Sequence, residues 1–388
     1  MPMSSRFLRL RSFTVSVLAV TVPAVLAVTV PAVLAAAPAV SAQAASAPNT
    51  FHQTNLISDL ANQGAQLVDA NLHNPWGLAF SPTSPLWVAN NNSGNATLYR
   101  INVGGTTVQK VNLTVALPGG RASTGDGPSP TGQVFNPTSG FVVTSSAGSG
   151  PAPFIFSSES GQITAWNPAA DPVVNGASTA TLEFSSRTAV YKGLAIGNIG
   201  QSTFLYASNF HDNRVDVFNS HFHPVHLFSN FRDGALPHGY APFGIQEING
   251  FLYVTYALQN AAKHDDVSGA GHGFVDIWTN EGILVRHLVI RGDLNSPWGL
   301  TVAPAGFGPF GGDLLVGNFG DGLIHAYGLI SGAPGGALLN EMHQPIQIDD
   351  LWALKFGTAS TGGTGTLLFS AGINDEVDGL VGSINPVP

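Results

Sequence analysis

The sequence predicts an all-β protein, a six-bladed β-propeller with four antiparallel strands per blade. Three observations predict it: a composition suited to short strands, a unit that recurs about every 55 residues, and a spare strand before the first unit. Charged residues make up 10% of the 388-residue chain, against about 25% in a typical soluble domain. Gly (46) and Pro (26) are abundant without a collagen-like period, which favours many strands joined by tight turns.

Residues 1–44 have the features of an export signal. Three arginines precede an apolar run, residues 12–40, that ends in the small residues SAQAAS. We therefore expect cleavage near Ala44, a secreted chain, and a propeller domain over residues 45–388. The apolar run is also long enough to span a bilayer, so an uncleaved anchor is the alternative. No later segment could span a membrane, and the lack of cysteine excludes disulfides.

A nearly repeated phrase marks the recurring unit. LHNPWGL (residues 72–78) returns as LNSPWGL (residues 294–300), and weaker copies lie between and after them. Each copy places a small residue after an extended apolar approach. These anchor positions are Gly77, Gly140, Gly193, Gly244, Gly299 and Ala353, spaced 51 to 63 residues apart.

After each anchor the same order of strands recurs. The hairpins read LWVANNNSGNATLYRI, FIFSSESGQITAWN, FLYASNFHDNRVDVFN, FLYVTYALQN with GFVDIWTN, LLVGNFGDGLIHAYG and LLFSAGINDEVDGLVGSINP. Their side chains alternate between apolar and polar, with Gly, Asn, Asp and Ser at the turns. A fourth strand follows in most units, from VQKVNLTV in the first to PIQI in the fifth. The sixth unit has only three strands, so we expect FHQTNLISDL (residues 51–60) to complete it and close the ring.

Several motifs together resemble an uncharacterised family of exported bacterial propellers. They are NPWGLA, LWVANN, TGQVFN, HDDVSGAGHGFVDIW, GNFGDG and AGINDEVDGL. Some members of that family carry a C-terminal PEP-CTERM sorting tail, whereas this sequence stops at SINPVP. More distantly the blades are similar to NHL repeats and to the gluconolactonase and paraoxonase group. The resemblance implies the fold and no established activity.

In a propeller the loops entering the innermost strands and the turns between second and third strands open at one end of the ring. The entering loops carry bulky residues that we expect to bind a ligand near this mouth of the channel: Trp76, Lys192, Phe243, Trp298 and Trp352. His211, in a second-to-third turn, is a further candidate ligand-binding residue. Aromatic rings there could stack on a sugar or another flat ligand. The alternative is that they pack between blades.

An insertion in the fourth unit, residues 257–273, gathers charged residues in a chain that is otherwise poor in charge. His264, Asp265, Asp266 and His272 are candidate catalytic residues, because carboxylates and imidazoles exchange protons and bind metals. The alternative is that they pin the loop. A weaker candidate is the entry loop at residues 117–133, whose Arg121 and Asp126 could reach the mouth.

Oxygen-bearing side chains in the second-to-third turns are candidate ligands of a divalent cation, with calcium expected. They are Asn90, Asn209, Asn318 and Asn374, joined by Asp265. The acidic balance, about −12 without residues 1–44, argues against a nucleic-acid partner.

Two functions remain open from the sequence. One is a metal-assisted enzyme of the hydrolase or lactonase type that acts on a small molecule at the mouth. The other is a non-catalytic module that binds carbohydrate or protein on the same face. No nucleophile-elbow, P-loop or zinc-protease motif is present, and the oligomeric state is left open.

Overall fold

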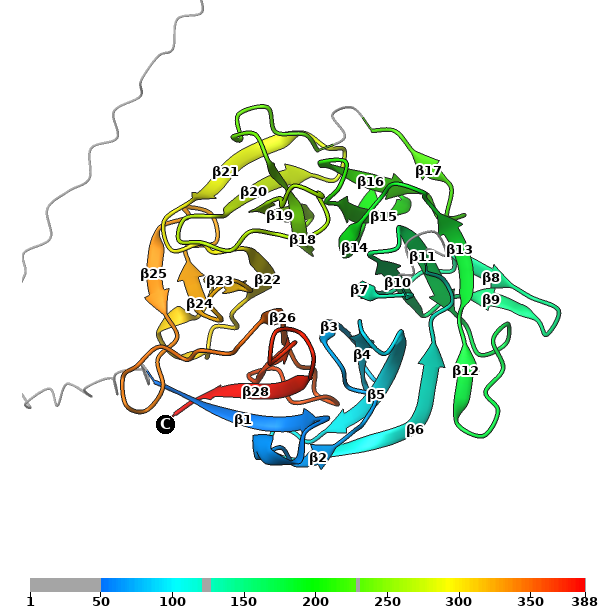
Figure 1. Ribbon diagram of the computed structural model, residues 1–388, viewed down its shortest axis with the longest axis horizontal. Coiled ribbons are helices and arrows are strands. Elements are labelled where there is room, and N and C mark those ends of the chain that lie inside the picture. Colours follow the sequence, from blue (N-terminus) through cyan, green and yellow to red (C-terminus); the bar gives the residue numbers. More distant parts are fainter. Residues whose placement is uncertain (1–49, 121–126, 228–230, 388) are drawn as a thin grey trace, which may run out of the picture. The chain divides into compact units, whose positions relative to one another are not determined.

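The computed structural model describes residues 50–120, 127–227 and 231–387, which belong to one compact unit. The expected export signal lies outside these ranges. Six sheets stand around an axis, so the predicted six-bladed propeller is confirmed (Figure 1). Within the described ranges, no helix is long and apolar enough to cross a membrane.

Blades one to three follow one another along the chain, each built outward from the axis. Blade one contains β3 (Pro75–Ala79), β4 (Leu86–Asn90), β5 (Asn95–Ile101) and β6 (Val108–Ala116). Blade two contains β7 (Pro130–Phe135), β10 (Phe154–Ser158), β11 (Gln162–Trp166) and β13 (Thr181–Ser185). Blade three contains β14 (Tyr191–Ile199), β15 (Ser202–Asn209), β16 (Arg214–Phe218) and β17 (Pro224–Val225).

Blades four to six complete the circle. Blade four contains β18 (Tyr240–Ile248), β19 (Phe251–Leu258), β20 (Phe274–Thr279) and β21 (Leu284–Ile290). Blade five contains β22 (Pro297–Val302), β23 (Leu314–Asn318), β24 (Ile324–Tyr327) and β25 (Pro334–Ala337). Blade six contains β26 (Leu351–Phe356), β27 (Leu367–Ala371), β28 (Leu380–Pro386) and the N-terminal β1 (Phe51–Ser58).

Short elements lie outside this pattern. β2 (Leu67–Val68) pairs in parallel with β1, and β12 (Ala177–Thr179) pairs in parallel with β6. β8 (Val142–Thr144) and β9 (Ser149–Pro151) form a separate hairpin, and two 3-10 turns cover Ala61–Gln63 and Gly308–Phe310.

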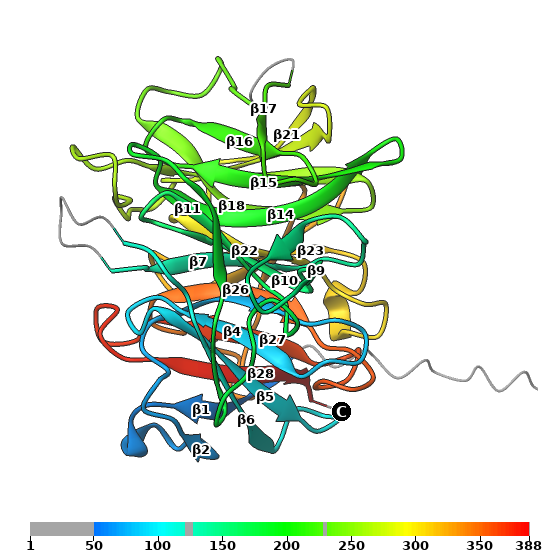
Figure 2. The same ribbon diagram turned by 90° about the vertical axis from the view of Figure 1, so that its right-hand side faces the viewer.

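The N-terminal strand closes the ring as predicted. β1 pairs antiparallel with β28 from Phe51 opposite Pro386 to Ser58 opposite Leu380. Figure 2, turned by 90°, shows β1 beside β2 and β28. Phe51, Leu56 and Ile57 are fully buried, so this strand adds to the core as well as to the hydrogen-bond ladder.

Every innermost strand has a register shift near its anchor residue. In blade one the shift lies between Pro75 and Leu78, and comparable shifts occur in the other five blades. A β-bulge adds a residue on one strand and turns a side chain to a new direction. The bulge therefore explains why the residue just before each anchor lies at the channel.

The anchors are small because neighbouring innermost strands approach closely there. A Cβ on Gly77 would lie 2.5 Å from the Thr131 carbonyl oxygen, and one on Gly299 would lie 2.5 Å from that of Trp352. A Cβ on Gly244 would overlap the Trp298 carbonyl oxygen. The recurring PWGL phrase thus combines a bulge with a glycine that leaves room for the next blade.

The prediction that Gly140 is the anchor of blade two is wrong. Gly132 on β7 occupies that position, because its missing side chain faces Leu194 of the next innermost strand. Gly140 instead precedes the β8–β9 hairpin. The run GFVV is more apolar than TGQVF, but its Phe141 and Val143 are buried in the contact between blades two and three, away from the axis. The fourth strand of blade five is likewise β25 rather than PIQI, which makes only isolated bridges.

Candidate functional site

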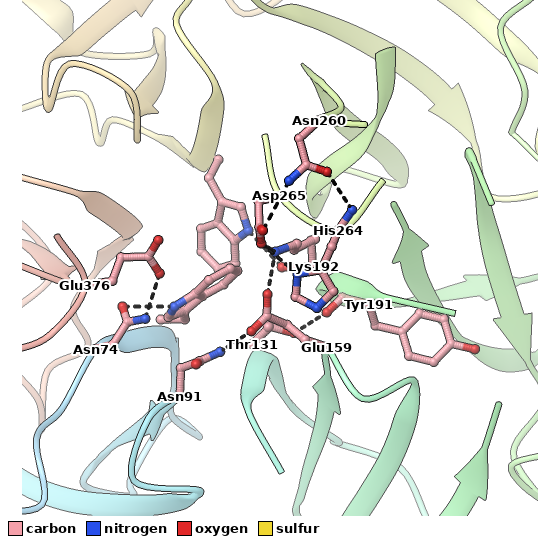
Figure 3. A network of polar contacts seen from close by, with 12 residues as sticks. Asn74, Asn91, Thr131, Glu159, Tyr191, Lys192, Asn260, His264, Asp265 and Glu376 are labelled. Atoms are coloured by element: carbon pink, nitrogen blue, oxygen red, sulfur yellow. Dashed lines mark hydrogen bonds and ion pairs between the residues drawn. The ribbon is translucent and has the colours of Figure 1, made fainter. Parts of the chain in front are cut away.

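The mouth of the channel brings together the starts of the innermost strands and the second-to-third turns. Hydrogen bonds link side chains from different blades there: Asn91 of blade one donates to Glu159 of blade two at 3.0 Å, and Asn74 donates to Glu376 of blade six at 2.8 Å (Figure 3). The expectation that these loops open on one end of the ring is confirmed.

Three tryptophans fill the channel below this rim. The rings of Trp76 and Trp352 stack with centroids 3.4 Å apart, and Trp298 meets them edge-on at 6.0 and 5.7 Å. Both stacked indoles donate to the Asn74 side-chain oxygen at 3.0 Å. The three rings are at most 9% exposed, and Phe243 is fully buried. This arrangement agrees with the packing alternative, and stacking on a ligand stays a prediction.

A small cavity lies along the channel on the side of the tryptophans away from the mouth. It measures about 40 Å³ and is lined by innermost-strand residues that include Gly132, Gln133, Trp298 and Lys355. That volume holds two or three water molecules. This cavity is therefore too small for a substrate-sized ligand.

Lys192 brings a positive charge into the buried rim. Its side chain is 3% exposed and forms ion pairs with Glu159 and, at 3.4 Å, with Asp265. Its ammonium also lies 5.2 Å from the Trp76 ring centroid, within cation–π range. Burial works to lower the pKa of Lys192, but Glu159, Asp265 and Glu376 outweigh it and raise the pKa. The raised pKa favours the protonated form of Lys192, which is the form that pairs with the two carboxylates.

The blade-four insertion lies at the mouth, because Asp265 reaches Lys192 from it. His264 Nδ1 is 2.7 Å from Asp265 Oδ1, and Asn260 accepts the His264 backbone N–H. The hydrogen bond with Asp265 raises the pKa of His264, and the same bond lowers the pKa of Asp265. With 36% of its side chain exposed, His264 is an oriented imidazole that solvent can reach.

The other two candidates in the insertion bond elsewhere. Asp266 accepts a hydrogen bond from Ser268 at 3.3 Å, and burial raises its pKa. His272 Nδ1 lies 2.8 Å from the Val267 carbonyl oxygen. These contacts agree with the alternative that the two residues pin the loop, and their catalytic role stays a prediction.

Glu376 joins the rim from blade six, in a second-to-third turn that the sequence predicts at the mouth, although no catalytic, binding or metal role was predicted for it. Burial raises its pKa to about 7, with Asn74 and Lys192 opposing and Glu159 and Asp350 adding to the rise. A carboxyl group with such a pKa can give or take a proton near neutrality. The signal available in the sequence was an acidic residue in the same turn position as Glu159.

Among the described residues, no hydrogen bond joins any two of the four predicted asparagine ligands. Asn90, Asn209 and Asn318 end the second strands of blades one, three and five and are fully buried, whereas Asn374 lies in an exposed turn. Asn209 bonds to Asp212 and Asp216. The side-chain oxygens of Asn90 and Asn318 have no hydrogen-bond partner within the described part of the chain. Their role as metal ligands stays a prediction.

Some acidic and histidine groups could nevertheless hold a metal ion. Three such groups have donor atoms within 4.8 Å of one another among the described residues: Glu159, His264 and Asp265; Asp59, His73 and Asp378; and Asp233, Asp276 and His287. The first group suits calcium poorly, because calcium takes six to eight oxygens. In addition, the Lys192 ammonium already bonds both carboxylates of that group.

A larger pocket lies beside the mouth between blades three and four. It measures about 480 Å³, within the range of small-molecule sites. His211 lines it together with Asp212, Arg232, His238 and Lys263, the last being the neighbour of His264 in the insertion. His211 Nδ1 lies 3.1 Å from Asp212 Oδ1. Arg121 and Asp126, the weaker candidates, lie outside the described residues.

The fold and this rim define a six-bladed propeller with an aromatic-filled channel and a charged mouth. The chain belongs to a family with two uncharacterised proteins of Acanthamoeba polyphaga mimivirus. One is 32% identical over 87% of this chain and 81% of the relative, and the other is 30% identical over 86% of each. No family model matches the sequence. Since these relatives are viral, the expected kinship with exported bacterial propellers and their sorting tail stays a prediction.

Solved structures similar to this chain include two propeller enzymes. Virginiamycin B lyase from Staphylococcus aureus is 12% identical over 87% of this chain and 99% of its own, with a TM-score of 0.47. The PQQ-bound aldose sugar dehydrogenase from Streptomyces coelicolor is 12% identical over 88% and 99%, with a TM-score of 0.49. Likenesses of this size carry no inference about activity.

Proposed function

We propose that the protein is an enzyme of the hydrolase or lactonase type that binds a small polar molecule or carbohydrate at the mouth of the channel. The observation that carries the proposal is the hydrogen-bonded pair of His264 and Asp265 beside the buried Lys192 ammonium. An imidazole oriented by a carboxylate is the usual arrangement for moving a proton during hydrolysis.

Each group has a role in this proposal. When His264 Nδ1 donates to Asp265, its Nε2 is left to exchange a proton with a substrate. Because the pKa of His264 is raised, the imidazolium persists to a higher pH and serves as a general acid. Glu376, with a pKa of about 7, is the second proton-exchanging group at the rim. Calcium stays a prediction, and no step here depends on it.

The pocket between blades three and four supports the proposal that a small polar molecule or carbohydrate binds at the mouth. It offers groups of both charges, from Asp212 to Arg232 and Lys263, to a polar ligand. The same pocket favours a second candidate function, a non-catalytic module that binds carbohydrate or protein. The two candidates differ in whether a bound ligand is turned over.

The test is an activity screen of the purified full chain on lactones, phosphoesters and glycosides. We expect turnover of at least one class, and His264→Gln is expected to lower kcat/KM about 10²- to 10⁴-fold. Asp265→Asn should shift the alkaline limb of the pH–rate profile to lower pH, because the bond that raises the His264 pKa is weakened.

His226→Gln is the matched control, since His226 is an exposed histidine outside the mouth, before blade four. It should leave kcat/KM unchanged. Equal activity of His264→Gln and the parent on every active substrate would remove the pair from the mechanism. Saturable carbohydrate binding without turnover would support the second candidate instead.

A further inference from the structure

A second cluster of titratable side chains lies away from the mouth, at the outer half of blade four. Asp276 on β20 and His287 on β21 face each other across the sheet, with His287 Nδ1 3.0 Å from Asp276 Oδ1. Asp233 lies in the segment that connects β17 to β18, and its Oδ2 is 3.1 Å from the same His287 nitrogen. Two carboxylates therefore share one imidazole nitrogen.

Both carboxylates are short of partners. Asp276 is fully buried, and its Oδ2 has no hydrogen-bond partner within the described chain. The side chain of Asp233 is 4% exposed, and its Oδ2 faces His287 without a hydrogen bond of good geometry. Burying two carboxylates side by side is costly in free energy, and a cation bound between them would offset that cost.

Among the described residues, His287 is the basic side chain that forms ion pairs with these two carboxylates. Burial raises the pKa of Asp276 to about 7, and Asp233 adds to the rise while His287 opposes it. Tyr256 on β19 packs nearby, and burial together with Asp276 and Asp233 raises its pKa as well. The Tyr256 hydroxyl accepts a hydrogen bond from the Trp278 indole at 3.1 Å. One histidine thus faces two buried carboxylates in an otherwise apolar pocket.

We propose that Asp233, Asp276 and His287 bind a divalent transition-metal ion, with Zn²⁺ as the best fit. Two ligands of a tetrahedral Zn²⁺ at about 2.1 Å lie about 3.4 Å apart, close to the 3.0 and 3.1 Å that separate the imidazole nitrogen from the two carboxylates. A nitrogen with two carboxylates suits Zn²⁺, whereas calcium and magnesium prefer oxygen alone. These three side chains would supply three of the four ligands of a tetrahedral Zn²⁺.

The ion would fasten the segment before β18 to blade four. This segment supplies Arg232, Asp233 and His238 to the wall of the pocket beside the mouth. Zn²⁺ binding would therefore hold that wall against blade four, independently of whether the mouth is catalytic.

The test is calorimetric titration of the EDTA-stripped full chain with ZnCl₂, together with thermal unfolding. We expect saturable binding by the parent and an increase in Tm on adding Zn²⁺. His287→Gln keeps a side chain that can bond to Asp276, and should weaken this binding step at least about tenfold. Asp233→Asn should weaken the same binding step. Because Asp233 lies in a connecting segment, this substitution leaves the strands of blade four unchanged.

His73→Gln and His264→Gln are the matched controls, because each removes the imidazole of one of the other two groups. The binding step that His287→Gln weakens should keep the affinity of the parent in both controls. The proposal would be overturned if the parent binds no Zn²⁺ at micromolar concentration, or if the variants at Asp233 and His287 bind it as the parent does. His287 would then only form ion pairs with the two carboxylates.

Discussion

Lys192 carries its ammonium group to a position that is 3% exposed, where a lone charge would be strongly destabilising. Its compensation comes from two other blades, with Glu159 in the β10–β11 turn of blade two and Asp265 in the insertion of blade four. One side chain from blade three thus joins three consecutive blades at the mouth. This ion network, rather than a free loop, sets the position of His264.

The position of these charges was predictable only in part. The sequence predicts Lys192, His264 and Asp265 at the mouth, because Lys192 lies at the start of an innermost strand and the other two lie in an insertion between the second and third strands. The contact between Lys192 and Asp265 was not predicted, since it depends on how far the bulge turns Lys192 into the channel. Glu376 was overlooked as a site residue because its raised pKa arises from burial, which a turn-like sequence does not reveal.

The raised pKa of Glu376 predicts that stability falls as pH rises from about 5 to 7. The ordinary value is 4.5 and the folded value about 7, so in this window the folded chain keeps a proton that the unfolded chain has lost. The unfolding free energy therefore decreases with pH. Between about pH 5 and 7, Glu376→Gln should reduce the fall in unfolding free energy by on the order of 2 kcal/mol. Urea unfolding at several pH values measures this fall.

Glu281→Gln is the control for that measurement, because Glu281 lies in an exposed turn. Asp350, with a pKa raised to about 6 chiefly by burial, acts in the same direction, so some slope should remain in the Glu376 variant. An unchanged slope in Glu376→Gln would show that its carboxyl group is ionised in the folded state well below pH 7.

At the scale of single elements, the innermost strands combine a bulge with a small anchor residue. Five of the six anchors were predicted from spacing and the apolar approach. Gly132 was not, because TGQVF is less apolar than the neighbouring GFVV and hydrophobicity was the stronger signal. What distinguishes the two is the close approach of the Leu194 backbone to Gly132, a contact between segments distant in sequence.

Gly244→Ala should destabilise the protein by about 3 kcal/mol, because the new methyl group would overlap the Trp298 carbonyl oxygen of the next blade. Chemical denaturation with tryptophan fluorescence measures the effect. Gly306→Ala is the matched control: its Cβ would meet nothing within 4 Å, and a change within about 0.5 kcal/mol is expected. Similar losses in both variants would contradict the role given to the anchors.

At the scale of the whole molecule, ring closure depends on β1. Blade six obtains its outer strand from the start of the described chain, and β1 also buries Phe51, Leu56 and Ile57. This closure was predictable because a count of strands left one without a blade. The added strands β2 and β12 were not predicted, since their two- and three-residue pairings have no sequence pattern of their own.

Removing residues 1–60 should lower Tm by about 10 °C or more relative to a chain lacking only residues 1–45. The longer deletion takes three buried side chains from the core and leaves β28 as an unpaired edge. Differential scanning calorimetry measures the difference, and size-exclusion chromatography reports aggregation at the exposed edge. Equal Tm values would show that β1 is dispensable for the ring.

The pairing of β1 with β28 also has a consequence during translation. β1 leaves the ribosome long before β28 exists, so the backbone groups of β1 that pair with β28 lack their partner until blade six is made. Contacts between segments so distant in sequence form slowly. The nascent protein thus exposes an aggregation-prone strand until β28 is synthesised, and its need for chaperones should be greatest in that interval.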